Sequence, residues 1–529
     1  MNSSSDAAAP VRWQPSHNPW LVALTVTLAT FMEILDTSIA NVALPHIAGN
    51  LSAGVDESTW VLTSYLVANA IVLPISGWFS SLIGRKNYYM ASVALFTVSS
   101  LLCGFAPSLG WLLFFRVMQG FGGGGLQPSE QSILADTFPT EKLGMAMALY
   151  GFAVVTAPVI GPTLGGWITD NYNWRWIFFI NIPVGLLSLY LTSRIVEDPP
   201  TLLRRSLKTS KIDGVGLGAI ALGLASLQIM LDKGQREDWF SSHLIVMLAV
   251  LAVLGLGFAI FWELRQQEPI VELRLLGERN FFFSNVLMFM LGLLLYGSTA
   301  LLPVFLQTLM GYSATTAGLV LSPGGIVTMI SMPLVGFLVA KIQPRYLIGF
   351  GLVIVGSSLL MMGGFDLQVD YRTAMLARVM QMAGVGFLWV PINAAAYAFL
   401  KPEKSTQASG FLNLSRNVGG GVGIALATTI QARYAQMHQA VLSANMTDLN
   451  PAYRSALSQM AQNLTAQGVS AARAAALAPG FLYQQLTSQA GMLGYRDDFR
   501  FMALVCFASL GLLLFLKKSQ RQKAPVPIH

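Results

Sequence analysis

The chain is a succession of apolar stretches, each long enough to cross a lipid bilayer. These stretches follow one another from Trp20 to Leu516. A helix needs about 20 mostly apolar residues to cross the hydrocarbon core. Only 11% of the 529 residues are charged, whereas soluble domains carry about 25%. A water-soluble fold could not hide so much apolar surface, so the sequence predicts an all-α integral membrane protein with the lipid bilayer as its solvent.

Hydropathy predicts about fourteen membrane-spanning helices. When the N-terminus is placed in the cytoplasm, the cytoplasmic loops and tails carry most of the 32 Lys and Arg residues. Both termini are therefore expected in the cytoplasm. The net charge of +7 reflects this topology and does not indicate a nucleic-acid partner. The approximate limits of the spans are 20–45, 58–80, 88–106, 109–137, 144–168, 175–194, 213–232, 242–263, 281–307, 315–340, 346–364, 372–400, 406–432 and 501–517.

The spans divide into six, two and six, because basic segments flank the seventh and eighth. Arg116–Gln119 (RVMQ), in the fourth span, recurs as Arg378–Gln381 in the fourth span of the second six, 262 residues later. This repeat favours two parallel six-helix bundles. The predicted parts are a cytoplasmic tail (1–19), an N-terminal bundle (20–198), a linker with two spans (199–274), a C-terminal bundle (275–518) and a cytoplasmic tail (519–529).

Residues 433–499 differ from the rest of the chain. They are rich in Ala, Gln and Ser and contain no apolar run long enough to cross the membrane. We expect an external, largely helical insertion in the C-terminal bundle. It is either a solvated cap or a docking surface for a periplasmic partner, and the sequence leaves both interpretations open.

Two acids lie near the middle of the first span. Glu33 and Asp36 differ by about 60° around a helix and share a face with Thr37 and Ala40. Burial and mutual repulsion both favour their protonated forms, so such carboxylates can load and release a proton near neutral pH. We expect Asp36, and with it Glu33, to couple transport to protons. Static acids that face a cavity and bind a cationic substrate are the alternative.

The fourth span carries a polar stripe on one face. Arg116, Gln119, Gln127 and Glu130 all lie within about 60° of one direction. Arg116 lies at a depth similar to that of Asp36, so the two can meet. An arginine beside the carboxylate favours its deprotonated form. The alternatives are a static ion pair and, for Glu130, a second proton or substrate site or a water-exposed position. The predicted substrate-cavity residues are Glu33, Asn41, Gln119, Gln127 and Gln381.

Glycine and proline concentrate in two places where helices turn or approach closely. After the second span, Gly77 and Gly84 precede a basic pair that can reach helix ends or an acid on the fourth span. Ordinary helix packing is the alternative at each glycine and proline. The predicted gating residues are Gly77, Gly84, Arg85, Lys86 and Asp136. Those of the fifth span are Gly151, Pro158, Gly161, Pro162 and Gly165.

Taken together, these runs resemble the major facilitator superfamily, and within it the drug:proton antiporters with fourteen spans of the EmrB-type branch. The resemblance rests on the first-span motif Leu35–Pro45 (LDTSIANVALP), motif A at Gly77–Lys86, motif B at Arg116–Gly120 and motif C at Gly161–Gly166. The run Trp174–Pro183 is typical of the branch at span 6. Motif A departs from the family at Ser81, where an acid is usual, which puts the family's cytoplasmic latch in doubt.

The resemblance implies two bundles that rock about a central cavity, with an acid on the first span coupling protons to export. Motif C is associated with exporters. The resemblance also implies a bacterial inner-membrane pump for small lipophilic compounds, with a periplasmic adaptor of the EmrA type and through it a TolC-type outer-membrane channel. The energy source is the proton gradient and no cofactor is expected.

Two other functions compete with broad export. The same fold could export one endogenous metabolite, such as a fatty acid or a siderophore. An integral-membrane enzyme is the alternative from another class. The sequence offers no metal-ligand cluster and no nucleophile–base pair, and its five His lie outside the central regions of the spans. Cys103 and Cys506 lie in apolar stretches and are interpreted as core residues.

Overall fold

The protein is helical throughout the part that the computed structural model describes, which is residues 15–199, 213–266, 269–400 and 404–518. These residues contain no strand. The all-α fold class predicted from the apolar stretches is therefore confirmed. Most of both predicted cytoplasmic tails (1–14 and 519–529), and residues 200–212 of the predicted linker, lie outside the described ranges.

Each of the predicted spans falls on helical structure. The first half contains α1 (Pro19–Asn50), α2 (Val55–Ser58), α3 (Trp60–Ile83), α4 (Arg85–Gly104), α5 (Leu109–Thr137), α6 (Thr140–Asn171), α7 (Trp176–Phe179) and α8 (Asn181–Ile195). Next come α9 (Gly214–Lys233), η1 (Trp239–Ser241), α10 (His243–Arg265) and η2 (Leu273–Gly277). The last part contains α11 (Arg279–Thr308), α12 (Ala314–Lys341), α13 (Pro344–Met362), α14 (Tyr371–Tyr397), α15 (Ser405–Ser443), α16 (Pro451–Ala466), α17 (Ala471–Ala508) and η4 (Ser509–Phe515).

Ten helices of the described ranges are long and apolar enough to cross a membrane, or eleven if the two parts of α6 form one span. The long helices α4, α5 and α15 are less apolar. The reason lies in where their polar residues go, because Ser100, Gln127 and Asn413 on these three helices are all buried inside the protein. Buried polar groups in a membrane protein bond to one another rather than to lipid.

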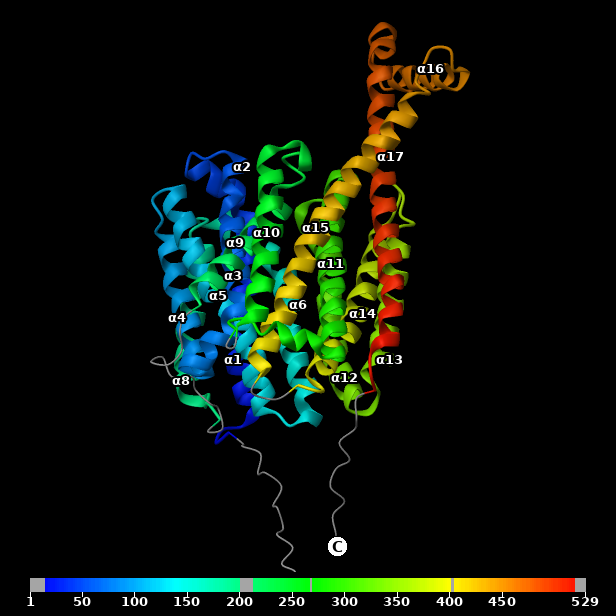
Figure 1. Ribbon diagram of the computed structural model, residues 1–529. Coiled ribbons are helices and arrows are strands. Elements are labelled where there is room, and N and C mark those ends of the chain that lie inside the picture. Colours follow the sequence, from blue (N-terminus) through cyan, green and yellow to red (C-terminus); the bar gives the residue numbers. More distant parts are fainter. Residues whose placement is uncertain (1–14, 200–212, 267–268, 401–403, 519–529) are drawn as a thin grey trace, which may run out of the picture.

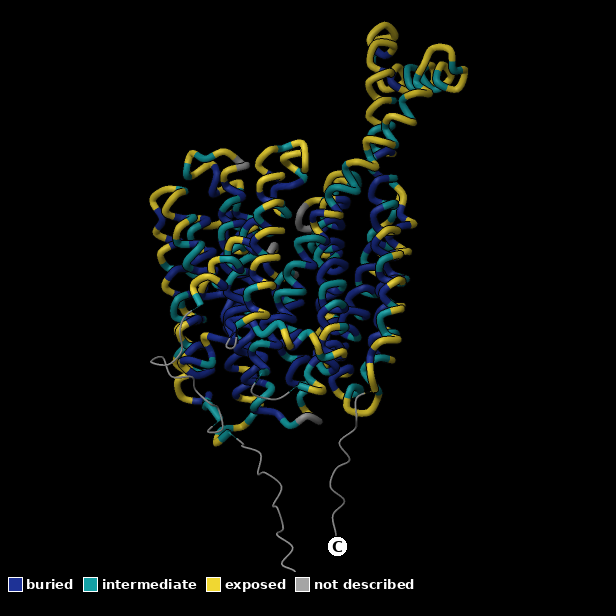
Figure 2. Tube along the Cα trace, viewed as in Figure 1, coloured by how far each residue is buried: buried dark blue, intermediate teal, exposed yellow. Residues whose placement is uncertain are grey.

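The helices form two groups that lie side by side (Figure 1). In the N-terminal bundle, α1 to α8, the main packing pairs are α3 with α5, α4 with α5, and α1 with α6. In the C-terminal bundle, α11 to α17, α11 packs on α15, and α13 packs on α14. The pair α9 and α10 packs together and contacts α3 and α15. Figure 2 shows that buried residues concentrate inside each group, while exposed ones follow the outer surfaces.

The two bundles touch at the end where α1 begins and η4 ends, which is called the inner end here. A Cβ placed on Gly410 of α15 would come within 2.6 Å of the Leu73 carbonyl on α3. A Cβ on Gly144 of α6 would come within 2.9 Å of the Gly336 carbonyl on α12. The backbones therefore approach so closely that only glycine fits. The bundles are packed against each other at the inner end.

The last membrane helix begins much earlier than the sequence predicted. Helix α17 starts at Ala471, whereas the apolar run suggested a start at 501. The charged residues just before 501 misled the prediction, because they face the protein. Asp498 is buried, Asp497 pairs with His438, and Arg500 donates to the Gly363 carbonyl at 3.0 Å.

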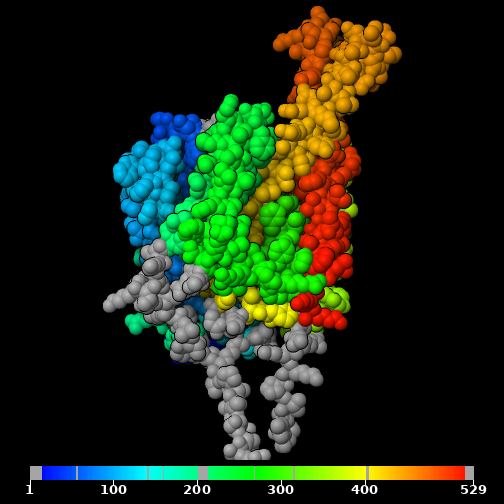
Figure 3. All heavy atoms as spheres, in the orientation of Figure 1, coloured from blue at the N-terminus to red at the C-terminus, as the bar shows by residue number. Residues whose placement is uncertain are grey.

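Residues 433–499 lie on the outer ends of α15 and α17 and on α16, which joins them. These helices project beyond both bundles in the ribbon and in the space-filling view (Figures 1 and 3). The segment is thus a continuation of two membrane helices rather than a separate unit. Its side chains are mostly exposed or half-buried.

Candidate functional site

Glycines of α5 bring its polar stripe into the centre of the N-terminal bundle. A Cβ on Gly120 would come within 2.5 Å of the Tyr65 carbonyl on α3. A Cβ on Gly122 would come within 2.6 Å of the Phe96 amide on α4. Because both neighbours pack directly on the α5 backbone, the polar side chains of α5 are sealed between α3, α4 and α1.

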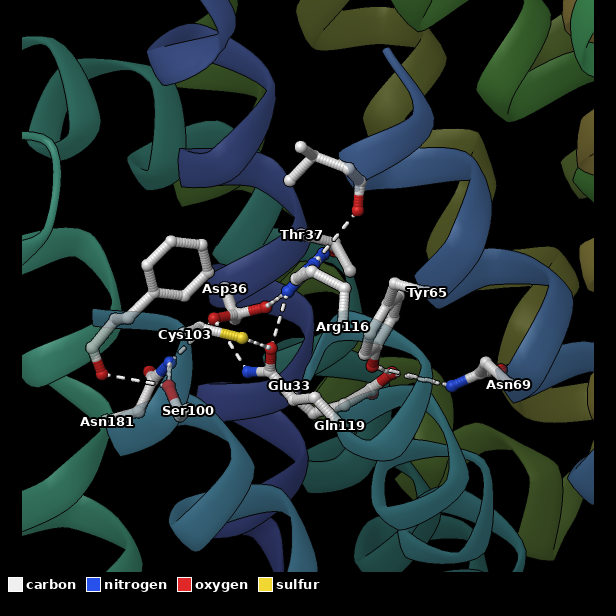
Figure 4. A network of polar contacts seen from close by, with 12 residues as sticks. Glu33, Asp36, Thr37, Tyr65, Asn69, Ser100, Cys103, Arg116, Gln119 and Asn181 are labelled. Carbon is white, nitrogen blue, oxygen red and sulfur yellow. Dashed lines mark hydrogen bonds and ion pairs between the residues drawn. The ribbon is translucent and has the colours of Figure 1, made fainter. Parts of the chain in front are cut away.

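Asp36 lies in a fully formed polar site (Figure 4). Its Oδ2 accepts from Arg116 Nη1 at 2.6 Å. Its Oδ1 accepts from Asn181 Nδ2 at 2.6 Å and from Gln119 Nε2 at 3.1 Å. The carboxyl is 2% exposed and Arg116 is 0% exposed. Three donors from two other helices thus converge on one buried carboxylate and stabilise its charged form.

Arg116 is held by more than the ion pair. Its Nε donates to the Val61 carbonyl at 3.0 Å, and its Nη1 also donates to Gln119 Oε1 at 2.7 Å. The guanidinium lies over the Tyr65 ring, 4.4 Å from the centroid. Its Nη2, however, is buried without a hydrogen-bond partner. The arginine is therefore anchored beside Asp36 and keeps one free donor.

Glu33 occupies a separate site on the same helix, so the two acids do not share their partners. Its Oε1 accepts from the Tyr65 hydroxyl at 2.8 Å and from Asn69 Nδ2 at 3.3 Å. Its Oε2 accepts from Gln127 Nε2 at 2.7 Å. The carboxyl is 3% exposed. Unlike Asp36, it forms no ion pair with an arginine within the described ranges.

The other predicted acid and amides lie at different distances from this centre. Glu130 is fully buried nearer the inner end, where its Oε1 accepts from the Thr27 hydroxyl at 2.7 Å while its Oε2 has no partner. Asn41, outward of Asp36, is exposed and lies outside the buried network. Thr37, on the predicted acidic face, donates to the Ile34 carbonyl of its own helix.

The repeat in the C-terminal bundle has the same hydrogen bond between arginine and glutamine but lacks the acid that corresponds to Asp36. Gln381 accepts from Arg378 Nη1 at 2.7 Å and donates to the Ser298 hydroxyl at 2.8 Å. Arg378 Nη2 donates to the Thr299 hydroxyl at 2.8 Å. With the same offset of 262 residues, Ser298 stands where the N-terminal bundle has Asp36. The repeat in this bundle therefore has arginine and glutamine in the same arrangement, with the Ser298 hydroxyl in place of the carboxylate.

The motif A residues lie together at the inner end. Arg85 forms an ion pair with Asp136 and also donates to the Ser132 carbonyl at 3.3 Å. Lys86 Nζ donates to the Ser193 carbonyl at 2.8 Å. Gly84 has a φ of 90°, which favours glycine. Gly77 faces Gln407 of α15 at the contact between the bundles. Ser81, the departure from motif A, bonds to the carbonyl of Trp78 in its own helix.

The glycines of motif C pack α6 against α1 and against the C-terminal bundle. Gly161 faces Ser38, Gly165 faces Ile39, and Gly151 faces Met332 and Trp389. The Pro158 carbonyl accepts from the Ser38 hydroxyl at 3.2 Å. Helix α6 bends by 45° between Lys142–Pro158 and Thr163–Asn171. The side chain of Pro162, the remaining predicted residue of this group, lies outside the described ones.

Sequence reasoning missed four residues of the buried network: Tyr65, Asn69, Asn181 and Tyr150. Asn181 lies in the run Trp174–Pro183, which was noted only as typical of the family. The available signal was a lone amide in an otherwise apolar segment, because a buried amide must find a partner. Tyr65 and Asn69 share a face of α3 at an i, i+4 spacing, which could have pointed to a common partner.

No group of three or more His, Cys, Asp or Glu that could hold a metal ion occurs in the part of the chain that the structure describes. Cys103 and Cys506 are both buried and free. The chemistry that this arrangement supports is the binding and release of protons and the recognition of polar groups by buried amides and arginines.

Comparisons with known proteins identify the family of the chain. The sequence profile described as the Major Facilitator Superfamily matches residues 26–428. The chain is 36% identical over 508 residues to the multidrug export protein EmrB of Escherichia coli strain K12, covering 95% of this chain and 97% of that one. It is also 36% identical over 479 residues to the fatty acid resistance protein FarB of Neisseria gonorrhoeae, covering 90% and 92%.

Solved structures support the fold. The human organic anion transporter MFSD10 superposes with a TM-score of 0.58 at 12% identity, covering 94% of this chain and all of that one. At such low identity this likeness shows the shared fold alone. Together with the profile match and the identity to EmrB across nearly the whole length, it establishes that the chain belongs to the major facilitator superfamily, as a multidrug efflux transporter of the EmrB type.

Proposed function

We propose that this efflux transporter exports hydrophobic and amphipathic compounds in exchange for protons, and that Asp36 is the proton carrier. The observation that supports this assignment is the convergence of Arg116, Gln119 and Asn181 on one buried carboxylate. Each of these donors stabilises the charged carboxylate, and protonation weakens all three bonds at once. Proton binding is thereby linked to the relative positions of α1, α5 and α8.

The cycle follows from this linkage. When Asp36 is charged, it holds the donors of α5 and α8 together. When a proton arrives, the ion pair with Arg116 is lost and the helices are free to shift relative to α1. A substrate that binds better to the deprotonated protein then competes with the proton, which is the thermodynamic basis of antiport. Glu33 and Glu130 are further carboxylates that can bind protons or the polar end of a substrate.

The proposal extends to location and partners. The multi-pass chain lies in the bacterial inner membrane with the inner end, and hence both termini, in the cytoplasm. The projection formed by residues 433–499 is then periplasmic, where it can contact an adaptor of the EmrA type that leads to a TolC-type outer-membrane channel. Its length beyond the bundles supports this role (Figure 3).

The test is substrate-driven proton efflux from everted membrane vesicles that contain the wild-type protein or Asp36→Asn. Addition of ethidium, a lipophilic cation, should release protons from acidified wild-type vesicles and none from the variant. Proton release by Asp36→Asn equal to wild type would refute the carrier assignment. Ethidium transport that continues after the proton gradient is collapsed would refute antiport itself.

The same vesicles separate broad export from a dedicated exporter of one metabolite. Ethidium, a neutral lipophilic dye and a long-chain fatty acid should each drive proton release if the pump is broad. A response to the fatty acid alone would support the second function, which the similarity to FarB brings forward.

A further inference from the structure

Arg416 of α15 connects the two bundles at mid-depth. This residue is 2% exposed and belongs to the C-terminal bundle. Its Nη2 donates to Gln127 Oε1 of α5 at 2.5 Å, and its Nη1 donates to the Tyr150 hydroxyl of α6 at 3.2 Å. Both acceptors belong to the N-terminal bundle. A buried guanidinium thus donates to the opposite bundle, and its Nη2 also donates to Asn417 Oδ1 of its own helix at 3.1 Å.

Gln127 joins this arginine to the acid of the first span. While its carbonyl oxygen accepts from Arg416, its Nε2 donates to Glu33 Oε2 at 2.7 Å. The amide therefore lies between a cation and an anion, with each end bonded to the complementary charge. Such chains polarise one another, so a charge at one end strengthens the bond at the other. Glu33 and Arg416 also attract each other directly through space.

We propose that Glu33, Gln127 and Arg416 form a proton-sensitive latch, in which the charged Glu33 carboxylate holds the C-terminal bundle closed against the N-terminal bundle through Gln127. Protonation of Glu33 removes the negative end of the chain. The bond from Gln127 then becomes an ordinary neutral one, the polarisation of the amide falls, and Arg416 loses its electrostatic partner. The latch weakens, and the inner end, where the bundles are in contact, opens.

The groups around Glu33 direct its effect toward Arg416. Asp36 and Arg116 compensate each other in their own ion pair. Tyr65 and Asn69 belong to the same bundle as Glu33 and move with it. The charged and titratable groups that face Glu33 from the helices packed around it are Asp36 of α1, Tyr65 of α3, Arg116 and Glu130 of α5, Tyr150 of α6 and Arg416 of α15.

Tyr150 of α6 supports the latch from a fourth helix. Its hydroxyl lies 3.1 Å from Gln127 Oε1 and 3.0 Å from Asn413 Oδ1. Because the hydroxyl has one hydrogen, it donates to one of these oxygens at a time while it accepts from Arg416. The phenol can therefore switch between the two bundles as they separate.

The latch gives the proposed antiport cycle, on which it rests, a physical link between proton uptake and the opening of the inner end. Asp36 and Arg116 lie within one bundle and the guanidinium stays protonated, so a proton that binds Asp36 does not by itself act on the other bundle. Glu33 lies 3 residues from Asp36 on the same helix, and its partner chain ends on the opposite bundle.

The experiment measures the opening of the inner end in lipid nanodiscs at a series of pH values. Spin labels are placed on Ile83 at the end of α3 and on Phe399 beyond α14, both of which are exposed at the inner end. Their separation is compared in wild type, Glu33→Gln, Arg416→Gln and the double variant. Arg378→Gln is the matched control, because this second buried arginine bonds to Thr299 and Gln381 of its own bundle.

In the wild type, the open fraction should rise as the pH falls. Glu33→Gln and Arg416→Gln should each raise the open fraction at high pH about tenfold to a hundredfold, the range that a hydrogen bond to a charged group contributes, and should flatten the pH dependence. The double variant should open no further than either single variant, because both break the same chain. Arg416→Lys should restore part of the pH dependence, and Arg378→Gln should retain it.

Independent, additive effects of Glu33→Gln and Arg416→Gln would overturn the latch, as would an unchanged pH dependence in Arg416→Gln. So would a wild-type inner end that does not respond to pH. The proposed antiport fails separately, since it is judged by proton release from vesicles. A wild-type protein that exchanges ethidium for protons while Arg416→Gln opens normally refutes only the latch.

Discussion

Asn181→Leu removes one of the three donors to Asp36 and keeps the branched shape of the side chain. In the structure Asn181 Nδ2 donates to Asp36 Oδ1 at 2.6 Å and to the Ser100 hydroxyl at 3.0 Å. A hydrogen bond to a charged group contributes about 1.5–3 kcal/mol. This bond stabilises the charged carboxylate selectively, so its loss weakens the hydrogen-bonded network around Asp36 by the same amount.

The expected effect follows from that magnitude. Since about 1.4 kcal/mol corresponds to a factor of ten, Asn181→Leu should reduce ethidium-driven proton release about tenfold to a hundredfold. The effect is a loss, because two donors remain where three stabilised the charged carboxylate.

The assay is the rate of ethidium-driven proton release from everted vesicles. Asn393→Leu is the matched control. Asn393 is equally buried but donates to the Trp389 carbonyl of its own helix. Proton release by Asn181→Leu equal to that of the control variant would refute the reasoning that this amide stabilises the charged form of the proposed proton carrier.

Two further predictions concern packing and a surface contact. Gly161→Ala should destabilise the protein by about 1–3 kcal/mol, because its new methyl group would meet Ser38. Gly166→Ala is the control, because a methyl group there has nothing within 4 Å and should leave the thermal transition unchanged. Equal melting temperatures of the two variants in detergent would contradict this prediction. Before the first helix, the hydroxyl and backbone N–H of Ser16 donate to Glu197 and hold the pKa of that carboxyl below its ordinary value of 4.5. A lowered pKa means that the contact stabilises the protein above pH 4.5 and that this stabilisation is lost as the pH falls through the pKa of the folded protein. Ser16→Ala should therefore speed hydrogen exchange near residue 16 at pH 7 and have little effect in strong acid. An equal effect at both pH values would show that the Glu197 carboxylate is not the cause.

The helical architecture could be predicted because hydropathy and helix geometry act locally. Each predicted span falls on helical structure, and the depth argument that let Arg116 reach Asp36 needed only the rise per residue. The structure places these two side chains 2.6 Å apart. Local periodicity does not predict the surroundings of residues that pack against other helices rather than facing lipid or water. Asp498 and its charged neighbours were taken for an aqueous segment, yet Asp498 is buried and Asp497 pairs with His438 of α15.

The contacts of the site that could not be predicted depend on which helices pack together, and a single sequence does not determine that packing. Gln127 and Arg416 bond across 289 residues of chain. Gln127 was recognised as part of a polar stripe, but no spacing rule joins helices of different bundles. Asn181 was equally visible as a polar residue, and its partner was not. A polar residue in a membrane helix indicates that it has a partner, whereas tertiary packing determines which residue that partner is.

The repeat differs between the two bundles, and this difference explains why a physical link between them is needed. In the N-terminal bundle the arginine of the repeat faces Asp36, whereas in the C-terminal bundle the same arrangement ends on Ser298. In the repeat, an acid therefore lies beside the arginine in the N-terminal bundle and a serine takes its place in the C-terminal bundle, although the proposed export cycle requires both halves to move. An acid that acts only within its own bundle changes that bundle alone, since a ligand shifts an equilibrium only through differential contacts. In the proposed latch, the bond from Arg416 to Gln127 supplies such a contact, because it joins the two bundles and would break if they parted.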